Sequence, residues 1–434
     1  MLSKTPAFNL KAVLRETGLA ADTLRAWERR YGLPMPQRTG GGHRLYSQYD
    51  IETIKWLTSR QAEGLSISRA VDSWNKLIAS NTDPLADSIP ASFINTPTSP
   101  PDTTLSAIRT EWVMACMNFS ETKAEQALNK AFSMFQVEAV CLEVLQKGMA
   151  EIGKLWFSNH ASVQQEHFAS GLAMRRIDAL LSASPPPSRL ETILIGCAPG
   201  EWHTFTPLLI AFLLRRRGLN VIYLGANVPA ERFAETASKL KTTLVILVAQ
   251  TLFSAATLQH AALSLTSQGV RTAFGGRIFN LRPNIIDYVP GHFLGNAVEN
   301  ALEEVENLLR KNLKERPIKT LSDEYVSALQ GFHAKRTSIE STLKKNIQPL
   351  SISSEELNNG IHFFGNNIAA ALQLGSLDHL SEEMNWLKTL LQTHKRPPQE
   401  FALFIENYSN AVDEQINGQG DPIKKWLLAY KETE

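Results

Sequence analysis

Cysteine is scarce in this sequence: a chain of 434 residues contains three, Cys116, Cys141 and Cys197. Their spacing fits neither a metal site nor a disulfide framework, so we expect free, buried thiols in a reducing compartment. Apolar runs of membrane-spanning length are also missing, and the first residues lack the basic-then-apolar order of a signal peptide. We therefore expect a cytoplasmic protein with no membrane partner.

Net charge is nearly absent as well, at +1, but it is unevenly distributed. Residues 1–77 contain 12 Lys and Arg against 7 Asp and Glu, so the surplus of positive charge lies there and the remainder is mildly acidic. Local positive charge is what a phosphate backbone attracts. The first segment is therefore a candidate for binding nucleic acid.

The residue composition and the spacing of apolar residues change several times along the chain, which predicts a multidomain protein. Ser, Thr, Pro and Asn dominate one stretch, which is typical of a linker. Further on, apolar strand-like runs alternate with amphipathic helices, as in a doubly wound parallel sheet. We expect a winged helix-turn-helix at 6–77, a linker at 78–105, a helical bundle at 106–185, an α/β domain at 188–313 and an all-α extension at 318–434.

Arginines and aromatic residues are interleaved in the basic segment. Two short helices joined by a tight turn, then a basic loop at Gly40–Gly42, are typical of a winged helix-turn-helix. Arginine pairs with guanine edges and phosphates, and glycine lets a backbone come close to phosphates. The candidate DNA-binding residues are Arg25, Arg29, Arg30, Tyr31, Arg38, His43, Arg44 and Tyr46.

The run RAWERRYGLPMPQRTGGGHRLY resembles the start of the MerR family of transcription regulators. The resemblance implies binding to double-stranded operator DNA as a homo-oligomer. Trp27 is better explained as a core residue than as a DNA contact. Family members dimerise through a long helix after the wing, whereas a linker stands at that place here, so we expect the dimer contacts elsewhere.

A glutamate and a histidine follow the first strand-like run of the α/β domain, in ILIGCAPGEWH. Ligands of open parallel sheets bind at the carboxyl ends of the strands, where Glu201 and His203 are expected. A neutral imidazole binds transition metals, and a carboxylate on its other ring nitrogen fixes the tautomer. Gly225 follows the second run, and Gly275 and Gly276 follow the fourth, so bare backbone reaches the same edge. The alternative for the pair is a solvated loop.

This arrangement resembles the cobalamin-binding domain of methionine synthase and B12-dependent mutases, whose signature is Asp-x-His-x-x-Gly, Ser-x-Leu and Gly-Gly. The resemblance implies that His203 is the lower axial ligand of cobalt and that Glu201 orients it. Glu201 stands in place of the aspartate, Thr206 in place of the glycine, and Ala249 and Thr251 in place of the serine and leucine. Glu201 and His203 keep the ligand chemistry, whereas Thr206 and Ala249 disfavour binding of the nucleotide tail.

The preceding stretch, WFSNHASVQQEH, resembles the Trp-x9-Glu-His motif of B12-dependent light-sensing regulators related to MerR. In that group a helical bundle caps the upper face of the corrin. The resemblance implies that adenosylcobalamin is the ligand, with methylcobalamin as the alternative, and that four residues line its upper pocket: Trp156, Val163, Glu166 and His167. A second histidine follows the tryptophan in those photoreceptors, but Phe157 stands there in this chain, with His160 the nearest histidine.

Together these features predict a cobalamin-binding, light-responsive MerR-type transcription regulator and not an enzyme. One alternative is a regulator whose pocket senses another ligand or a partner protein. A second is a cobalamin-dependent enzyme subunit, but the chain lacks a substrate domain such as a (β/α)8 barrel of about 250 residues. The extension at 318–434 matches no pattern, and oligomerisation or binding of a partner protein remain open for it.

Overall fold

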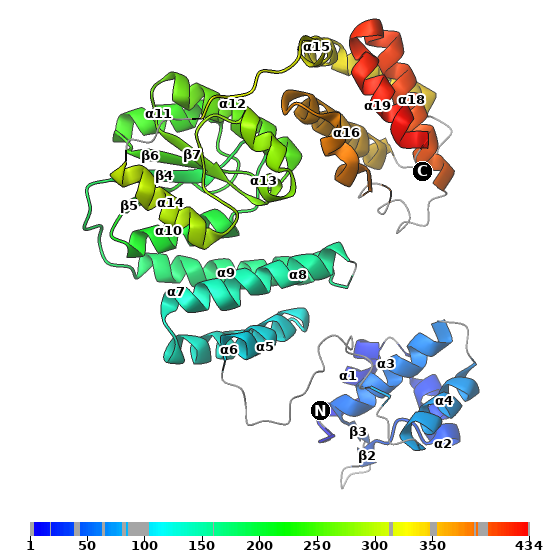
Figure 1. The fold of residues 1–434 in the computed structure, drawn as a ribbon. Helices are drawn as coiled ribbons and strands as arrows, with labels where there is room; N and C mark the ends of the chain where they lie inside the picture. Colours follow the sequence, from blue (N-terminus) through cyan, green and yellow to red (C-terminus); the bar gives the residue numbers. More distant parts are fainter. Residues whose placement is uncertain are drawn as a thin grey trace. The chain divides into compact units, whose positions relative to one another are not determined.

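The computed structural model describes residues 4–17, 19–38, 44–62, 66–79, 84–85, 104–158, 160–311, 316–347, 354–385, 388 and 398–432. It divides into two compact units, Met1–Asp102 and Thr103–Glu434, each of which is described by itself (Figure 1). His43, the rest of the predicted glycine loop and most of the predicted linker lie outside the described residues.

The first unit is a winged helix-turn-helix, as predicted. Its elements are β1 (Phe8–Asn9), α1 (Leu10–Thr17), α2 (Ala21–Tyr31), β2 (Gln37–Arg38), β3 (Arg44–Tyr46), α3 (Gln48–Ala62) and α4 (Ile67–Ala79). The strands form an antiparallel sheet in the order β1-β3-β2. Leu24 and Trp27 lie one turn apart on α2 and are both buried, so α2 packs by one face. Gly32 ends α2 with φ of 66°, a left-handed conformation that costs glycine little.

The second unit begins with the predicted helical bundle. It consists of α5 (Leu105–Met117), α6 (Glu121–Met134), α7 (Val137–Val140), the π-helical turn η3 (Cys141–Gln146), α8 (Lys147–Phe157) and α9 (Val163–Ser182). Helices α5 and α8 approach closely, because a Cβ at Gly148 would lie 2.8 Å from the Trp112 ring. A capping box of Ser162 and Gln165 begins α9. Burial raises the pKa of Cys116 and Cys141 to about 12, as expected for unreactive thiols.

A parallel sheet in the order β5-β4-β6-β7-β8 follows. Its strands are β4 (Thr192–Cys197), β5 (Asn220–Tyr223), β6 (Leu244–Val248), β7 (Thr272–Gly275) and β8 (His292–Phe293). Its helices are α10 (Phe205–Arg216), α11 (Ala230–Leu240), α12 (Leu252–Ser267), α13 (Arg277–Leu281), the 3-10 turn η4 (Pro283–Tyr288) and α14 (Val298–Arg310).

Helices cover both faces of the sheet, which confirms the doubly wound α/β prediction (Figure 1). Successive strand residues point to opposite faces, so Ile193 and Ile195 pack toward α10 and α14, whereas Leu194 packs toward α11 and α12. The chain runs from β4 outward to β5 and then returns to β6 on the other side of β4. Such a switch leaves a crevice at the carboxyl ends of these two strands, where ligands of this architecture bind.

The C-terminal extension is all-α, as predicted, and shares its core with the sheet domain. Its elements are α15 (Asp323–Asn346), α16 (Ser354–Gln373), η5 (Leu377–Leu380), α18 (Pro398–Ile416), η6 (Asn417–Gly420) and α19 (Asp421–Glu432). One continuous buried cluster runs from Leu247 in β6 through Leu258 in α12 to Phe364 and Tyr408. Among the described residues, no helix is long and apolar enough to cross a membrane.

Candidate functional site

The loop after β4 is held rigidly at the crevice. Gly200 has φ of 78°, and a Cβ there would lie 2.5 Å from the Phe253 ring, so no other residue fits without movement. The Gly200 amide donates to Oδ1 of Asn227 at 2.8 Å. The loop backbone is therefore fixed before the two predicted side chains project from it.

Glu201 is buried, with 1% of its surface exposed, and its carboxylate accepts four hydrogen bonds. Oε1 accepts from the amide of His203 at 2.9 Å and from its Nδ1 at 2.6 Å. Oε2 accepts from the amide of Gln250 at 2.6 Å and from Oγ of Ser254 at 2.7 Å. Burial opposes ionisation, but the bonds from His203, Ser254 and Gln250 outweigh it and lower the pKa of Glu201. The carboxylate is therefore ionised and oriented.

His203 combines a fixed Nδ1 with an exposed ring. Its side chain is 68% exposed, although Nδ1 is bonded to the buried carboxylate. The hydrogen bond with Glu201 raises the pKa of His203 against the opposing effect of burial. When Nδ1 carries the proton of the neutral ring, the lone pair lies on Nε2. This donor chemistry suits a transition metal such as cobalt approaching from outside.

Ser254 and Gln250 were missed from the sequence. The family signature asks for a serine at position 249, and Ala249 there is fully buried. The hydroxyl that reaches Glu201 comes instead from Ser254, in the first turn of α12. A capping box formed by Thr251 and Ser254 at that helix start was the signal in the sequence.

The three predicted glycines differ in what they require. A Cβ on Gly276, which has φ of 131°, would lie 1.8 Å from the carbonyl oxygen of Ala249, so this glycine lets two strand ends touch. A Cβ on Gly225 would meet no atom within 4 Å, and one on Gly275 only Leu294 at 3.9 Å. Gly225 thus leaves open space, as a bulky ligand would need, whereas Gly276 has a structural role.

The predicted upper-pocket residues gather where α8 ends and α9 begins. Large apolar side chains are exposed there, with Trp156 40% and Val163 42% accessible. Glu166 accepts from Nδ1 of His167 at 2.7 Å if that nitrogen is protonated. The Glu166 charge also raises the pKa of His203, which indicates that bundle and loop lie near each other. Exposed apolar side chains beside a loop that presents a histidine are typical of a binding surface.

In the first unit, Arg25 and Arg29 lie one turn apart on α2, on the face opposite the buried Trp27. Arg25, Arg29 and Arg30 are exposed, and the Arg30 guanidinium lies 5.5 Å from the centre of the Tyr31 ring. Asp22 lies 3.5 Å from Arg25, a pairing between exposed groups that DNA can displace. The helix therefore offers a row of cations to a groove.

The assignment of Tyr46 to DNA is wrong. Tyr46 is fully buried, and its hydroxyl donates to Oε1 of Glu28 at 2.5 Å. Arg44 donates through Nε to Oε2 of the same carboxylate at 2.7 Å, and no described residue accepts a hydrogen bond from its terminal nitrogens. Arg38 pairs with Arg44 in the sheet, and its side chain lies outside the described residues.

Three segments match known families. Residues 8–74 match the MerR HTH family regulatory protein, and residues 108–181 and 191–305 each match a B12 binding domain. The extension beyond residue 305 lies outside these segments.

Two HTH-type transcriptional repressors of Myxococcus xanthus are similar over most of their length. CarH is 29% identical over 245 residues, which are 56% of this chain and 79% of CarH. CarA is 28% identical over 240 residues, which are 55% and 75% of the two chains. The structure of the Methanosarcina barkeri monomethylamine corrinoid protein aligns with a TM-score of 0.41 at 18% identity, over 47% of this chain and 100% of that one.

Proposed function

We propose that this chain, which joins a MerR-type helix-turn-helix to B12-binding domains and resembles the CarH and CarA repressors, is a transcription regulator controlled by a bound cobalamin. One observation carries the proposal: a buried, ionised Glu201 orients an exposed His203 at the carboxyl end of β4. A cytoplasmic location fits a protein that binds operator DNA.

The residues of the crevice have distinct roles in this proposal. His203 binds cobalt through Nε2, while Glu201, supported by Ser254 and Gln250, holds the ring in place. Four residues from the bundle form the upper pocket: Trp156, Val163, Glu166 and His167. Gly225 and Gly275 leave room for the corrin beside the backbone, and Gly276 lets the chain after β7 lie against Ala249 at the same edge. Adenosylcobalamin is the proposed form, with methylcobalamin as the alternative. A bound alkylcobalamin supplies a light-sensitive cobalt–carbon bond, so light is the proposed signal.

DNA binding is assigned to α2 and the wing. Arg25, Arg29 and Arg30, with Tyr31, reach the groove, and Arg38, His43 and Arg44 contact the backbone of the operator. The operator is double-stranded DNA bound by a homo-oligomer. A ligand changes this equilibrium only as far as the DNA-binding assembly prefers one cobalamin form over another.

There are two alternatives: a cobalamin-dependent enzyme subunit and a regulator that senses another ligand. Similarity to two repressors over most of their length supports a regulator rather than an enzyme. A regulator that senses a different ligand is supported by Thr206 and Ala249, which depart from the cobalamin signature, and by Phe157 after the tryptophan.

The test is retention of cobalamin by the purified full chain. After incubation with adenosylcobalamin in the dark and gel filtration, the protein fraction should carry a corrin absorbance spectrum. His203→Ala should lose most of it, whereas Ser267→Ala, at an exposed residue on α12, should not. If the wild type elutes without corrin, the alternative with another ligand replaces this proposal.

A further inference from the structure

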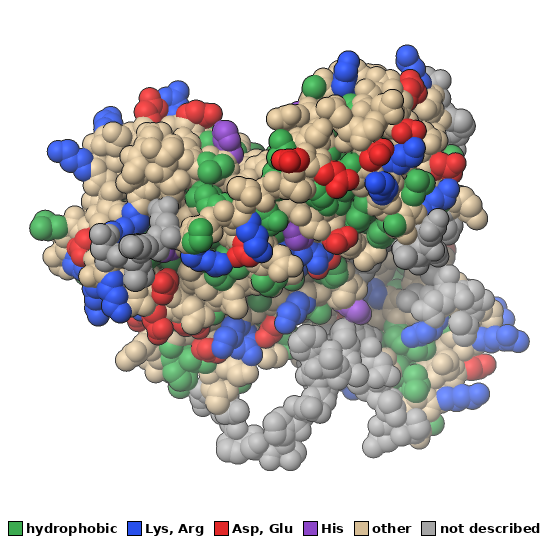
Figure 2. Space-filling model, turned by 45° about the horizontal axis from the view of Figure 1, so that its top comes forward, with side chains coloured by type: hydrophobic (Ala, Val, Ile, Leu, Met, Phe, Trp, Pro, Cys, Tyr) green, Lys and Arg blue, Asp and Glu red, His purple; other side chains and the backbone are tan. Residues whose placement is uncertain are grey.

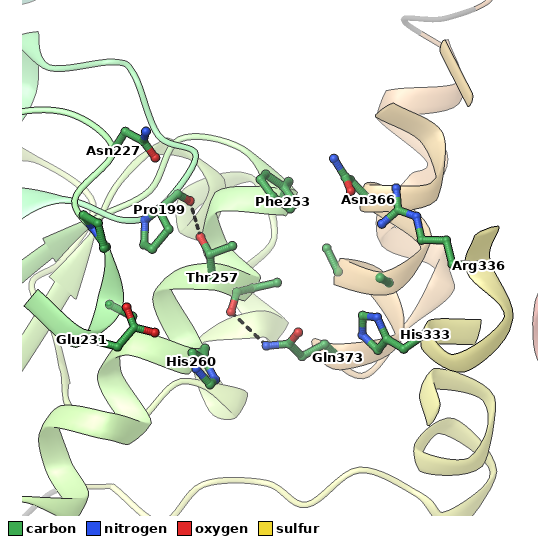
Figure 3. A pocket seen from close by; sticks show the side chains of 15 residues that line it. Pro199, Asn227, Glu231, Phe253, Thr257, His260, His333, Arg336, Asn366 and Gln373 are labelled. Atoms are coloured by element: carbon green, nitrogen blue, oxygen red, sulfur yellow. Dashed lines mark hydrogen bonds between the residues drawn. The ribbon is translucent and has the colours of Figure 1, made fainter. Parts of the chain in front are cut away.

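A second cavity, distinct from the crevice at His203, lies between the sheet domain and the C-terminal helices. It encloses about 520 Å³, and its walls come from α11 and α12 on one side and from α15 and α16 on the other. Figure 3 shows the two walls facing each other across the gap, and Figure 2 shows the surface hollowed between the same two lobes. Six of its fifteen lining residues therefore belong to the extension that lies outside the matched families.

The lining combines apolar and polar side chains. Its apolar part includes Ala256, Ala369, Ala370 and the Phe253 ring. Asn366, His333 and Arg336 come from the C-terminal helices, and Thr257 and His260 from α12. Asn227, Gln373 and the carboxylate of Glu231 also line the cavity. A concave site of this volume that combines apolar surface with several polar groups is typical of small-molecule binding.

Arg336 is the fixed cation of this cavity. Its Nε forms an ion pair with Oε1 of Glu340 at 2.8 Å, and one terminal nitrogen, Nη2, donates to the carbonyl oxygen of His362 at 3.0 Å. These two bonds hold the guanidinium plane while its other terminal nitrogen, Nη1, has no hydrogen bond to any described residue. A guanidinium held in this way loses little entropy on binding a carboxylate or phosphate.

The opposite wall is the back of the loop that presents His203. Oγ of Thr257 donates to the carbonyl oxygen of Pro199 at 2.6 Å. Oδ1 of Asn227 accepts from the Gly200 amide at 2.8 Å, and the backbone N–H of Asn227 donates to the carbonyl oxygen of Glu201 at 2.9 Å. Phe253 stands directly behind Gly200. A molecule in the cavity would therefore press on residues that fix the loop.

We propose that this cavity binds a small organic anion, with its carboxylate or phosphate group on Arg336 and its apolar body against Phe253, and that this binding changes the affinity of the His203 loop for cobalamin. The effect on cobalamin affinity rests on the proposed function, whereas the binding of the anion does not. Coupling of two sites is reciprocal, so cobalamin would change the affinity for the anion by the same factor.

The first test measures binding of three probes to the full chain by equilibrium dialysis: 2-naphthoate, 1-naphthyl phosphate and the neutral 2-naphthamide. The measurement is made with the crevice saturated by hydroxocobalamin and repeated without it. At least one anion should bind about tenfold more tightly than the amide, because a charge-assisted bond to arginine is lost in the neutral probe. The preferred anion identifies the head group, and equal affinity for all three would overturn the anion site.

Variants of the cavity residues then test whether the probe binds in this cavity. Arg336→Gln should weaken anion binding about tenfold, whereas Lys335→Gln, at the exposed neighbour on α15, should not. Asn366→Trp fills the cavity and should abolish binding, which also decides the matter if Arg336→Gln fails to fold. Anion binding retained by a folded Asn366→Trp chain would show that the probe sits elsewhere and would overturn the proposal.

The last test measures the dissociation constant of cobalamin with and without a saturating amount of the better probe. Coupling of typical size changes it by about fivefold or more. An unchanged constant overturns the coupling and leaves the anion site standing. A wild type that binds the probe but no cobalamin overturns the proposed function instead, so the two failures are distinguishable.

Discussion

At the residue scale, the Glu201 carboxylate is the group on which the loop geometry depends. It is withdrawn from water and compensated by three side-chain and backbone donors besides the His203 ring. A buried charge with its bonds satisfied stays ionised and oriented, whereas one that loses a donor becomes costly. Substitutions around it should therefore affect both folding and ligand binding.

The Ser254 hydroxyl is one of these donors, and Ser254→Ala removes it. We expect a loss of about 1.5–3 kcal/mol in the free energy of unfolding, because the bond is to a charged group. Cobalamin affinity should fall as well, since the His203 ring is less firmly held. Ser267→Ala, at an exposed serine on the same helix, is the control. Thermal unfolding and equilibrium dialysis measure the two effects, and equal behaviour of both variants would contradict the role of Ser254.

Phe157 is 64% exposed at the end of α8 and cannot bind a metal. Phe157→His should supply a second imidazole at the upper pocket. After illumination of the adenosylcobalamin complex, this variant should retain more cobalamin through gel filtration than the wild type. Phe157→Ala, which removes the ring without adding a ligand, should behave like the wild type. Strong retention by the illuminated wild type would contradict this, and His160→Ala would then show whether His160 binds instead.

Two arginines of the first unit should affect DNA binding differently. Arg25→Ala should cost about 1–3 kcal/mol of discrimination between operator and other sequences, as expected for a base contact. Arg44→Ala should weaken binding to all sequences and reduce the slope of log affinity against log salt by about one. Because Arg44 also pairs with Glu28, the fold is checked by circular dichroism. Identical salt slopes for wild type and Arg44→Ala would refute the phosphate assignment.

At the element scale, helix α12 connects two regions of the second unit. Its first turn supplies Ser254 to Glu201, and its middle packs against α16. Gln373 of α16 donates to the carbonyl oxygen of Ala256 at 2.9 Å and to Oε1 of Gln259 at 2.7 Å. A shift of α16 along α12 would break these bonds, so the C-terminal helices have a defined register on the sheet domain.

The spacing of apolar residues in the sequence predicted helices and strands better than it predicted which of them pack against each other. Strands β4 to β7 and the arginines of α2 could be predicted because each depends only on residues close together in the sequence. Strand β8 has two residues and no apolar run, so nothing marked it. Ser254 lies 53 positions from Glu201, and only the adjacency of β4 and β6 brings them together. Likewise, an apolar helix face indicates burial without saying what covers it, so the docking of the extension was not predicted.

The close approach of α5 and α8 gives a matched pair of glycine substitutions on α8. A Cβ at Gly148 would lie 2.8 Å from the Trp112 ring, whereas one at Gly153 would meet nothing within 4 Å. Gly148→Ala should therefore destabilise the protein by about 1–3 kcal/mol through overpacking. Gly153→Ala should stabilise it by roughly 0.5–1 kcal/mol, because alanine favours the helix. Chemical denaturation measures both, and a neutral Gly148→Ala would show that the helices can move apart.

At the scale of the whole molecule, the two lobes of the second unit meet through ionisable groups as well as apolar ones. Burial raises the pKa of Glu383 from 4.5 to about 7, with Arg282 and Arg277 opposing and Glu382 reinforcing the shift. Between these pH values the folded state holds a proton that the unfolded state has lost. This contribution to stability is complete below pH 4.5 and is lost as the pH rises through 7.

Glu383→Gln should remove that pH dependence. At pH 8 the variant should be more stable than the wild type by about 1–3 kcal/mol, and at pH 4.5 the two should be nearly equal. Glu382→Gln, at a side chain 49% exposed, should leave the pH dependence in place. Unfolding midpoints at both pH values decide this, and parallel curves for wild type and Glu383→Gln would contradict the assignment.

The continuous core between the sheet and the C-terminal helices determines how this chain can be cut and recombined. A sensor fragment ending at Arg310 would leave the Ala256 and Leu258 side of α12 facing water, along with the tyrosine ring of Tyr288 that sits under Gly375. Such a fragment should aggregate during purification. A chimeric regulator should therefore contain residues 104–432 as one intact unit, with the DNA-binding domain of another protein fused before Thr104.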